Sequence, residues 1–293
     1  MTDTPFVSTE IATQPALWRQ VSAGFAQYGG ALPQPGQRVA AVGCGTSWFM
    51  AMAYAALRED LGQGETDAFA GSEFAYGRQY DAIVVISRSG TTTEVLELIR
   101  RTTVPTIAIT ATPGSPITEL ADTTILLDFA DEQSVVQTRF ATTTLALLRA
   151  SLGQDLTQAA TDAESALTVD VDELAKLEQV TYVGTRWTVG LAHEAGLKQR
   201  EAASAWTEAY PAMDYRHGPI AIAQPGRGVW LFGEAPAGFL DDVAATGATI
   251  VHHADLDPMA SLVIAQRVAV AKSLAHGLDP DQPRSLSRSV ILD

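Results

Sequence analysis

Short runs rich in valine, isoleucine and alanine recur along this chain, and helical apolar spacing follows most of them. In the first half the runs lie at 38–42, 82–87 and 105–110. Strands that are apolar at nearly every position belong to parallel sheets covered by helices on both faces. The first half is therefore predicted to be a doubly wound α/β domain. Further elements predicted there are helices at 12–28, 48–61 and 92–101 and a strand at 66–70.

The same alternation restarts in the second half, after a helical stretch predicted at 134–152 and a polar helix after Asp155. The segment RVAAVGCGTSWFMAMAYAAL from Arg38 has a counterpart from Gln179, QVTYVGTRWTVGLAHEAGLK. Two explanations remain open, a duplicated domain or a coincidental likeness between strand-turn-helix units. Either way the chain is predicted to form two doubly wound domains, at 1–160 and 161–293. Strands are predicted at 180–184, 228–232 and 248–251, and a long apolar helix at 259–275.

Charge and composition exclude several classes of function. The formal net charge is −15 at pH 7, which repels nucleic acid and anionic membranes, so neither is an expected partner. Cys44 is the single cysteine, and the five histidines show no metal-ligand spacing, so neither a metal nor another cofactor is expected. No apolar stretch reaches about 18 residues, and the start has no leader pattern, so we expect a cytoplasmic protein.

The strongest chemical signal is VVISRSGTTTEVLELI at 84–99, in which an apolar strand runs through a hydroxyl-rich loop into a helix. A helix N-terminus offers unpaired N–H groups and a partial positive charge to a phosphate. Ser87, Ser89 and Thr92 add hydroxyl donors, and Gly90 permits a tight turn. The alternative is that a threonine of the loop only caps the helix, with Glu94 completing a capping box.

A second loop, GCGTS at 43–47, follows the first predicted strand. Ligands of open α/β sheets bind at this carboxyl edge, so Ser47 is expected to face the same phosphate. A tight strand-to-helix connection is the other explanation, and the glycine spacing is not that of a dinucleotide fingerprint. The candidate phosphate-binding residues are Gly45, Thr46, Ser47, Ser87, Arg88, Ser89 and Thr92.

GCGTS followed by SRSGTTTE resembles the sugar isomerase (SIS) domain family, whose Ser/Thr loops hold the phosphate of a sugar phosphate. The resemblance implies two tandem SIS domains, each with a flavodoxin-like α/β fold, and a phosphorylated sugar as the ligand. Within the family, the stretch at 132–145 resembles the tagatose-6-phosphate ketose/aldose isomerase branch. The segments TEIATQP, GSEFAYG, LKQREAASAWTEAYPAMDYRHGP and DPDQPRSLSRSV resemble the isomerase half of glucosamine-6-phosphate synthase.

Glu194, Lys198 and Glu201 are spaced i, i+4, i+7, which places them on one helix face. Moving a carbonyl between C1 and C2 of a sugar requires a group that removes a proton and returns it. The resemblance places the family's proton-shuttling glutamate at Glu201, and neighbouring active-site positions at Glu194 and Lys198. Without it, an exposed, salt-bridged helix face would be the ordinary interpretation.

Two further positions match the family's active site. His217 lies in YRHGP, and the resemblance implies that it assists ring opening and comes from the neighbouring subunit, so that the protein is a homodimer. The alternative is a turn histidine bonded to backbone. Arg288 stands where the synthase has its Schiff-base lysine, and a guanidinium cannot form an imine. Arg288 can still hold a phosphate or a sugar oxygen. His252 and His253, at a strand end, are expected to face solvent.

The function expected from the resemblance is aldose-ketose isomerisation, or deamination with isomerisation, of a hexose or aminohexose 6-phosphate. A deglycase acting on a fructosamine phosphate is a related alternative, because the same proton transfer labilises a C–N bond. A non-catalytic sugar-phosphate sensor is the alternative from another class. Such sensors usually carry a DNA-binding helix, and no basic recognition helix is visible in this sequence.

Overall fold

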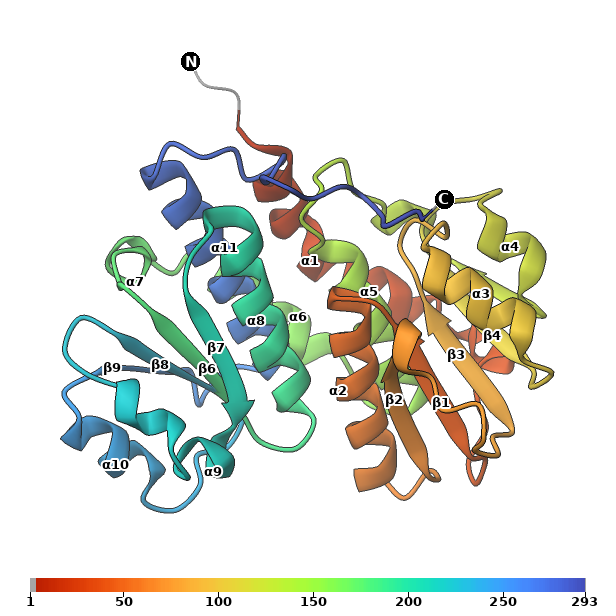
Figure 1. Cartoon of the computed structure of the whole chain (residues 1–293), viewed down its shortest axis with the longest axis horizontal. Helices are drawn as coiled ribbons and strands as arrows, with labels where there is room; N and C mark the ends of the chain where they lie inside the picture. Colours follow the sequence, from red (N-terminus) through yellow and green to blue (C-terminus); the bar gives the residue numbers. More distant parts are fainter. Residues whose placement is uncertain (1–3, 293) are drawn as a thin grey trace. The chain divides into compact units, whose positions relative to one another are not determined.

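The computed structural model describes residues 4–292 (Figure 1). The chain forms two compact units, each built around one parallel sheet. The five-stranded unit comprises 16–133, 137–156 and 287–292, and the four-stranded unit comprises 4–15, 134–136 and 157–286. The two sheets therefore lie on opposite sides of residue 160 in the sequence, while three short segments are exchanged between the units. One of these segments, 287–292, proves important for the candidate site.

The five-stranded sheet is parallel throughout, with strand order β2-β1-β3-β4-β5. This is the flavodoxin-like order, and it reverses direction between β1 and β3. The strands are β1 (Val39–Gly43), β2 (Thr66–Ala70), β3 (Ala82–Ile86), β4 (Thr106–Thr110) and β5 (Thr123–Leu126). Every residue of β1, β3 and β4 is buried, as the apolar runs predict. The edge strand β5 was not predicted, because it is short and half of it is threonine.

Helices cover both faces of this sheet. Val95 and Leu98 of α3 pack with Val85 and Ile83 on one face, and α2 contacts β1 and β2. The helices of the unit are α2 (Thr46–Asp60), α3 (Thr93–Arg101), α4 (Pro116–Leu120), α5 (Arg139–Ser151) and the C-terminal part, residues 16–23, of α1 (Phe6–Ala23). Because side chains alternate along a strand, burial of all five residues in β3 requires helices on both sides.

Two predicted helices have different limits in the structure. The helix predicted at 134–152 begins only at Arg139, because the backbone N–H groups of Thr138 and Arg139 donate to the Glu132 carboxylate. A side chain thus satisfies amides that a longer helix would have bonded internally. The helix predicted at 12–28 is α1, which begins directly after Pro5 and ends before Gly24.

The four-stranded sheet is also parallel, with order β7-β6-β8-β9. Its strands are β6 (Val180–Gly184), β7 (Thr207–Pro211), β8 (Gly228–Phe232) and β9 (Thr249–His252). Strand β7 was not predicted, since TEAYP is partly exposed and ends in proline. The helices are α6 (Thr157–Ala166), α7 (Asp172–Ala175), α8 (Thr188–Ala203), α9 (Ala212–Tyr215), α10 (Phe239–Ala245) and α11 (Pro258–Ala275).

The packing of α11 explains why its sequence is apolar on every face. It packs against α8, α6 and α7, and the Trp230 indole of β8 donates to its Ser261 hydroxyl at 3.0 Å. A helix surrounded in this way has little solvent-facing surface to carry charge. Within residues 4–292, no helix combines the length and apolar character needed to cross a bilayer.

The prediction that His252 and His253 face solvent is wrong. Both are half-buried. The His252 ring nitrogen lies 2.9 Å from the Gly233 carbonyl oxygen, and His253 Nδ1 lies 3.0 Å from Ser261 Oγ. The packing of β9 against β8 and α11 draws these rings inward, which the position of a strand end in the sequence does not reveal. Burial, together with the neighbouring His252, lowers the pKa of His253.

This burial predicts a pH-dependent loss of stability. Because the folded pKa of His253 lies below its unfolded value of about 6.5, the unfolded chain binds the proton more readily. Stability contributed by the neutral ring is therefore present above about pH 6.5 and is lost as the pH falls. We expect His253→Gln to lose less melting temperature between pH 7.5 and pH 5.5 than the native chain. The exposed His276→Gln serves as the control, and equal pH slopes for native chain and both variants would contradict the prediction.

Candidate functional site

The strand order reverses direction at the carboxyl ends of β1 and β3. The chain leaves β1 toward β2 on one side, and β3 toward β4 on the other, so the two following loops separate at this point. Val42 of β1 is in register with Val85 of β3, and the loops at 43–47 and 87–92 therefore start at the same edge. Ligands of doubly wound sheets bind at such a switch point. The two loops selected from the sequence therefore start at neighbouring strands of this edge.

The loop at 87–92 has a shape that only glycine allows at its centre. Gly90 has φ of +65°, and a Cβ on it would lie 2.1 Å from Ser115 Oγ. The Gly90 N–H donates to Ser87 Oγ at 3.2 Å, and the Thr91 N–H donates to Ser89 Oγ at 3.3 Å. A hydroxyl that accepts a backbone N–H keeps its own O–H for donation. Ser87 and Ser89 can therefore shape the loop and still donate to a ligand.

The capping explanation of this loop is wrong. Thr92 is the N-cap residue of α3, but its side chain makes no capping hydrogen bond. The Thr91 hydroxyl bonds to Ser89 Oγ and to Ser289 Oγ, at 3.0 and 2.9 Å. Neither threonine hydroxyl is therefore used to cap the helix, and the Thr92 hydroxyl stands at the positive end of the α3 dipole without serving the helix.

The loop at 43–47 combines close packing with two buried hydroxyl residues. Gly43 must lack a side chain, because a Cβ there would lie 2.5 Å from the Ser47 carbonyl carbon. Gly45 has φ of +53° and precedes α2. Thr46 and Ser47 form the buried first turn of that helix, and the Ser47 N–H donates to the Cys44 carbonyl. The turn thus holds Ser47 at the start of a helix, at the same sheet edge as the 87–92 loop.

Arg88 is buried within the loop and forms an ion pair inside the protein. Its Nη1 lies 3.1 Å from Glu132 Oε2, and the side chains are 3% and 0% exposed. Its Nη2 donates to the Arg288 carbonyl oxygen at 3.4 Å. The charge selected from the sequence as a phosphate ligand is thus directed at Glu132. Sequence reasoning missed Glu132, although it lies in the family-like stretch at 132–145.

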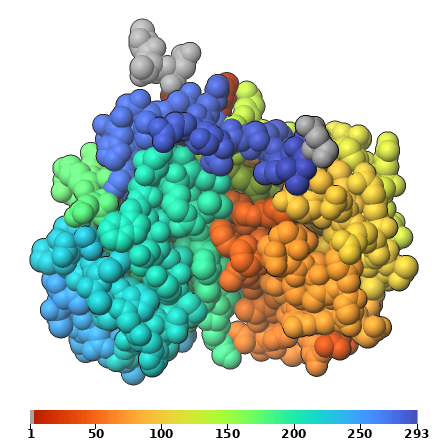
Figure 2. All heavy atoms as spheres, viewed as in Figure 1, coloured from red at the N-terminus to blue at the C-terminus, as the bar shows by residue number. Residues whose placement is uncertain are grey.

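The segment that carries Arg288 runs along the start of α3. The Arg288 guanidinium donates to the Asp131 carboxylate and to the Glu132 carbonyl oxygen. Beyond it, the Thr93 N–H donates to the Val290 carbonyl and the Leu292 N–H donates to Thr93 Oγ1. The C-terminal segment lies on the surface beside α3 in Figure 2, as blue spheres next to yellow ones. Asp131, which bonds to this segment, and Ser289, which belongs to it, were not singled out in the sequence.

The charged stripe on α8 belongs to the four-stranded unit and is largely buried. Lys198 Nζ lies 3.4 Å from Glu194 Oε1 and 2.5 Å from Glu201 Oε2. Glu194 and Lys198 are 1% exposed, and Glu201 is 19% exposed. The alternative of an exposed, salt-bridged helix face is therefore wrong. Burying such groups costs desolvation energy, and arrangements of this kind are enriched in functional sites. Glu201 is the member of the cluster that solvent reaches.

His217 lies in the same unit as this cluster. It follows α9, its N–H donates to the Asp214 carbonyl, and its side chain is exposed. Gly218 comes next with φ of +149°, a conformation that favours glycine and turns the chain. The structure thus presents the imidazole to solvent on a fixed turn. Within residues 4–292, no cluster of histidine, cysteine and carboxylate side chains is arranged to hold a metal ion.

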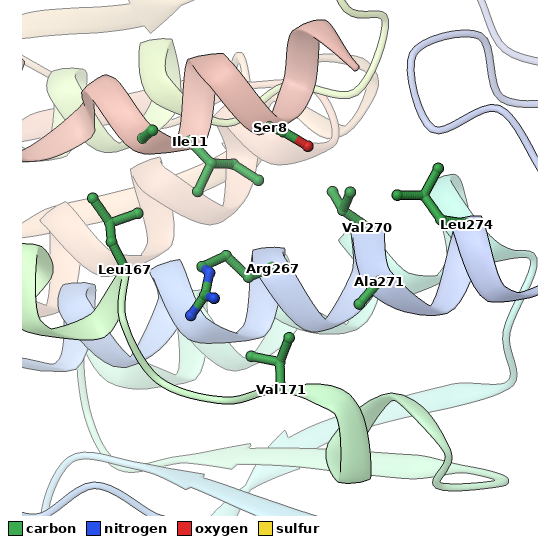
Figure 3. A pocket seen from close by; sticks show the side chains of 9 residues that line it. Ser8, Ile11, Leu167, Val171, Arg267, Val270, Ala271 and Leu274 are labelled. Atoms are coloured by element: carbon green, nitrogen blue, oxygen red, sulfur yellow. The ribbon is translucent and has the colours of Figure 1, made fainter. Parts of the chain in front are cut away.

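The four-stranded unit also contains a pocket of about 330 Å³ beside α1 and α11 (Figure 3). Its walls are aliphatic apart from Ser8 and Arg267. Arg267 Nη1 donates to the carbonyl oxygens of Ala166 and Val169, and burial lowers the pKa of the guanidinium. The guanidinium is thus already bonded to backbone, and Ser8 supplies the one hydroxyl of the lining. The 87–92 loop offers a ligand several hydroxyl donors instead.

Comparison with known families identifies the class of domain in the five-stranded unit. Residues 34–152, which include both loops, match the family described as the SIS domain. Residues 34–152 are therefore matched as a SIS domain. The match ends within the helices that precede β6, so the matched segment contains the whole five-stranded sheet, the loops after β1 and β3 and the Arg88–Glu132 pair.

Curated proteins named glutamine-fructose-6-phosphate aminotransferase (isomerizing) are similar to most of this chain. The chain is 25% identical to the glutamine-fructose-6-phosphate aminotransferase (isomerizing) of Streptococcus pneumoniae, over 98% of this chain and 58% of that protein. It is 26% identical to the enzyme of the same name from Sulfurisphaera tokodaii, over 88% of this chain and 50% of that protein. The chain thus spans between half and about three fifths of the length of these relatives.

Solved structures share the fold over nearly the full chain. Glucosamine-6-phosphate deaminase from Thermotoga maritima superposes with a TM-score of 0.80 and 21% identity, covering 98% of this chain and 100% of the other. Tagatose-6-phosphate ketose/aldose isomerase from Escherichia coli superposes with a TM-score of 0.74 and 18% identity, covering 98% and 97%. At these identities the likeness concerns the fold. Both sheets have counterparts in such proteins.

Proposed function

We propose that this chain is a phosphosugar isomerase with two SIS domains, acting on a hexose or aminohexose 6-phosphate. The observation that carries the proposal is the 87–92 loop, in which the Thr92 hydroxyl, at the N-terminus of α3, is not used as a helix cap. Hydroxyl donors and a helix dipole bind a phosphate without a basic patch, which suits a chain with a net charge of −15. The names of the relatives support a sugar phosphate as the ligand.

In this proposal Glu201 transfers the proton between C1 and C2. A carboxylate that accepts the C1 or C2 proton must return it to the adjacent carbon, and the Lys198 ammonium, 2.5 Å from Glu201 Oε2, fixes the position of the carboxylate. Ring opening is assigned to the exposed imidazole of His217, a side chain type that can exchange a proton with the ring oxygen. We further propose a homodimer in which His217 acts in the partner's site, and light scattering in solution measures its mass.

The reaction type is decided by one assay. The purified protein is incubated with a panel of hexose and aminohexose 6-phosphates, and ketose formation and ammonia release are followed separately. Ketose without ammonia establishes an isomerase, and ketose with ammonia a deaminase, as in the solved structure from Thermotoga maritima. Release of an amine from a fructosamine phosphate establishes a deglycase. Binding of these ligands without any turnover contradicts the proposal of an enzyme and favours a non-catalytic sugar-phosphate sensor.

Thr92→Val tests the phosphate loop. Valine keeps the shape of threonine and removes the hydroxyl, and no capping bond is lost. A hydrogen bond to a charged group contributes about 1.5 kcal/mol or more, so we expect KM for the sugar phosphate to rise about tenfold with an unchanged melting temperature. Thr103→Val, at an exposed position after α3, is the matched control. An unchanged KM in Thr92→Val would show that this hydroxyl does not bind the ligand.

A further inference from the structure

The C-terminal segment 288–292 is held to the phosphate loop by contacts from two directions. From the loop, Thr91 Oγ1 bonds to Ser289 Oγ at 2.9 Å, and from the start of α3 the Thr93 N–H donates to the Val290 carbonyl at 3.2 Å. From the segment at 131–132, the Asp131 carboxylate and the Glu132 carbonyl oxygen both accept from the Arg288 guanidinium. All of these groups belong to the five-stranded unit.

Arg88 joins these two sets of contacts. One nitrogen of its planar fork binds the Glu132 carboxylate at 3.1 Å, and the other binds the Arg288 carbonyl oxygen at 3.4 Å. Glu132 is fixed from its other side, since its second oxygen accepts the N–H groups of Thr138 and Arg139 and the Thr138 hydroxyl. The rigid guanidinium of Arg88 therefore connects the tail backbone, through Glu132, to the start of α5.

A buried ion pair is a poor source of stability, because the cost of desolvating both charges offsets their attraction. Burial of Arg88 and Glu132, at 3% and 0% exposure, therefore suggests a role in geometry rather than in folding energy. The geometry in question is the position of the tail relative to the phosphate loop. Arg88 is part of that loop, and its guanidinium makes its second bond to the tail. The Arg288 side chain is engaged at the same place, by Asp131.

We propose that Arg88 and Glu132 are positioning residues that hold the segment 288–292 against the phosphate loop, with Arg288 and Asp131 as the outer anchor. Order in the tail and occupancy of the loop are then linked, since Thr91 bonds both to Ser89 of the loop and to Ser289 of the tail. By reciprocity, a ligand that orders the loop also protects the tail. This linkage rests on the proposed binding of a sugar phosphate, whereas the anchoring itself does not.

Hydrogen exchange of the full chain tests the anchoring without any ligand. The readout is the exchange rate of peptides covering 288–292, with β3 peptides as the internal reference. We expect Asp131→Asn and Arg288→Ala to speed tail exchange about tenfold and to leave β3 unchanged, because each removes one charge-assisted anchor. Arg288→Lys, which restores a cation for Asp131, should recover most of the protection. Glu119→Gln, an exposed carboxylate on α4, is the matched control.

Three results would overturn the anchoring. Tail exchange at the native rate in Asp131→Asn and Arg288→Ala would show that these groups hold nothing. Equal acceleration of tail and β3 peptides would show loss of overall stability instead. Equal loss of protection in Arg288→Lys and Arg288→Ala would show that the cation is irrelevant.

The linkage is tested by adding fructose 6-phosphate as the probe. We expect this ligand to slow tail exchange in the native chain about tenfold. Removal of the anchor in Asp131→Asn should raise KM by a larger factor than it lowers kcat. Fructose 6-phosphate that binds, as shown by calorimetry, but leaves tail exchange unchanged overturns the linkage alone. Failure of the probe and of every other sugar phosphate to bind contradicts the proposed function, while the ligand-free exchange result still decides the anchoring.

Discussion

Replacing Glu201 with glutamine is expected to lower kcat by about a thousandfold, the range typical for loss of a general acid/base. Glutamine has nearly the shape of glutamate but cannot accept and return the C1 or C2 proton. The phosphate is assigned to the loop at 87–92, so binding of the sugar phosphate should be retained, with Kd changed by no more than about threefold. Turnover of the substrate found in the panel, together with calorimetric titration of the same ligand, measures both quantities.

A matched control separates chemistry from charge. Glu173 pairs with Lys176 three residues later on the surface, whereas Glu201 pairs with Lys198 three residues earlier at a largely buried position. Glu173→Gln removes the same carboxylate charge from the same unit and should leave kcat within about twofold of the native value. Native turnover in Glu201→Gln would exclude Glu201 as the proton carrier. Loss of both turnover and binding would instead point to a structural role in the α8 cluster.

Most of the fold is predictable because burial on both faces leaves a strong trace in the sequence. The strand predicted at 66–70 coincides with β2, and that at 180–184 coincides with β6. Strands β5 and β7 escaped notice, since an edge strand is paired on one side only and tolerates polar residues such as Thr123 and Glu208. Their existence follows from the sheet as a whole rather than from their own composition.

The candidate site is predictable only where it is local. The hydroxyl-rich loop at 87–92 and the i, i+4, i+7 stripe on α8 are contiguous patterns, so sequence reasoning found both. Glu132 and Asp131 act on Arg88 and Arg288 across separations of 44 and 157 residues. Apart from its place at the start of the family-like stretch 132–145, nothing near Glu132 in the sequence distinguishes it from a solvated glutamate. Its partners become evident only when β3 and the start of α5 are placed together.

Replacing Arg88 with methionine is expected to lower the free energy of unfolding by about 3 kcal/mol, since it leaves the Glu132 carboxylate buried without its cation. The N–H groups of Thr138 and Arg139 still solvate that carboxylate, so we place the loss at the lower end of the range for broken buried pairs. The melting temperature of the five-stranded unit should fall by roughly 6–12 °C. Calorimetry, with hydrogen exchange of β3 peptides to identify the unit, measures the change.

The double variant Arg88→Met with Glu132→Gln shows whether the uncompensated charge causes that loss. Glutamine keeps an oxygen for the Thr138 and Arg139 N–H groups and removes the charge, so the double variant should recover about half of the stability lost in Arg88→Met. Additive losses would mean that Arg88 acts through packing. If recovered stability leaves tail exchange fast, folding energy and tail position have been separated, because the bond from Arg88 to the Arg288 carbonyl is still missing. That separation is what distinguishes a positioning residue from a residue needed only for stability.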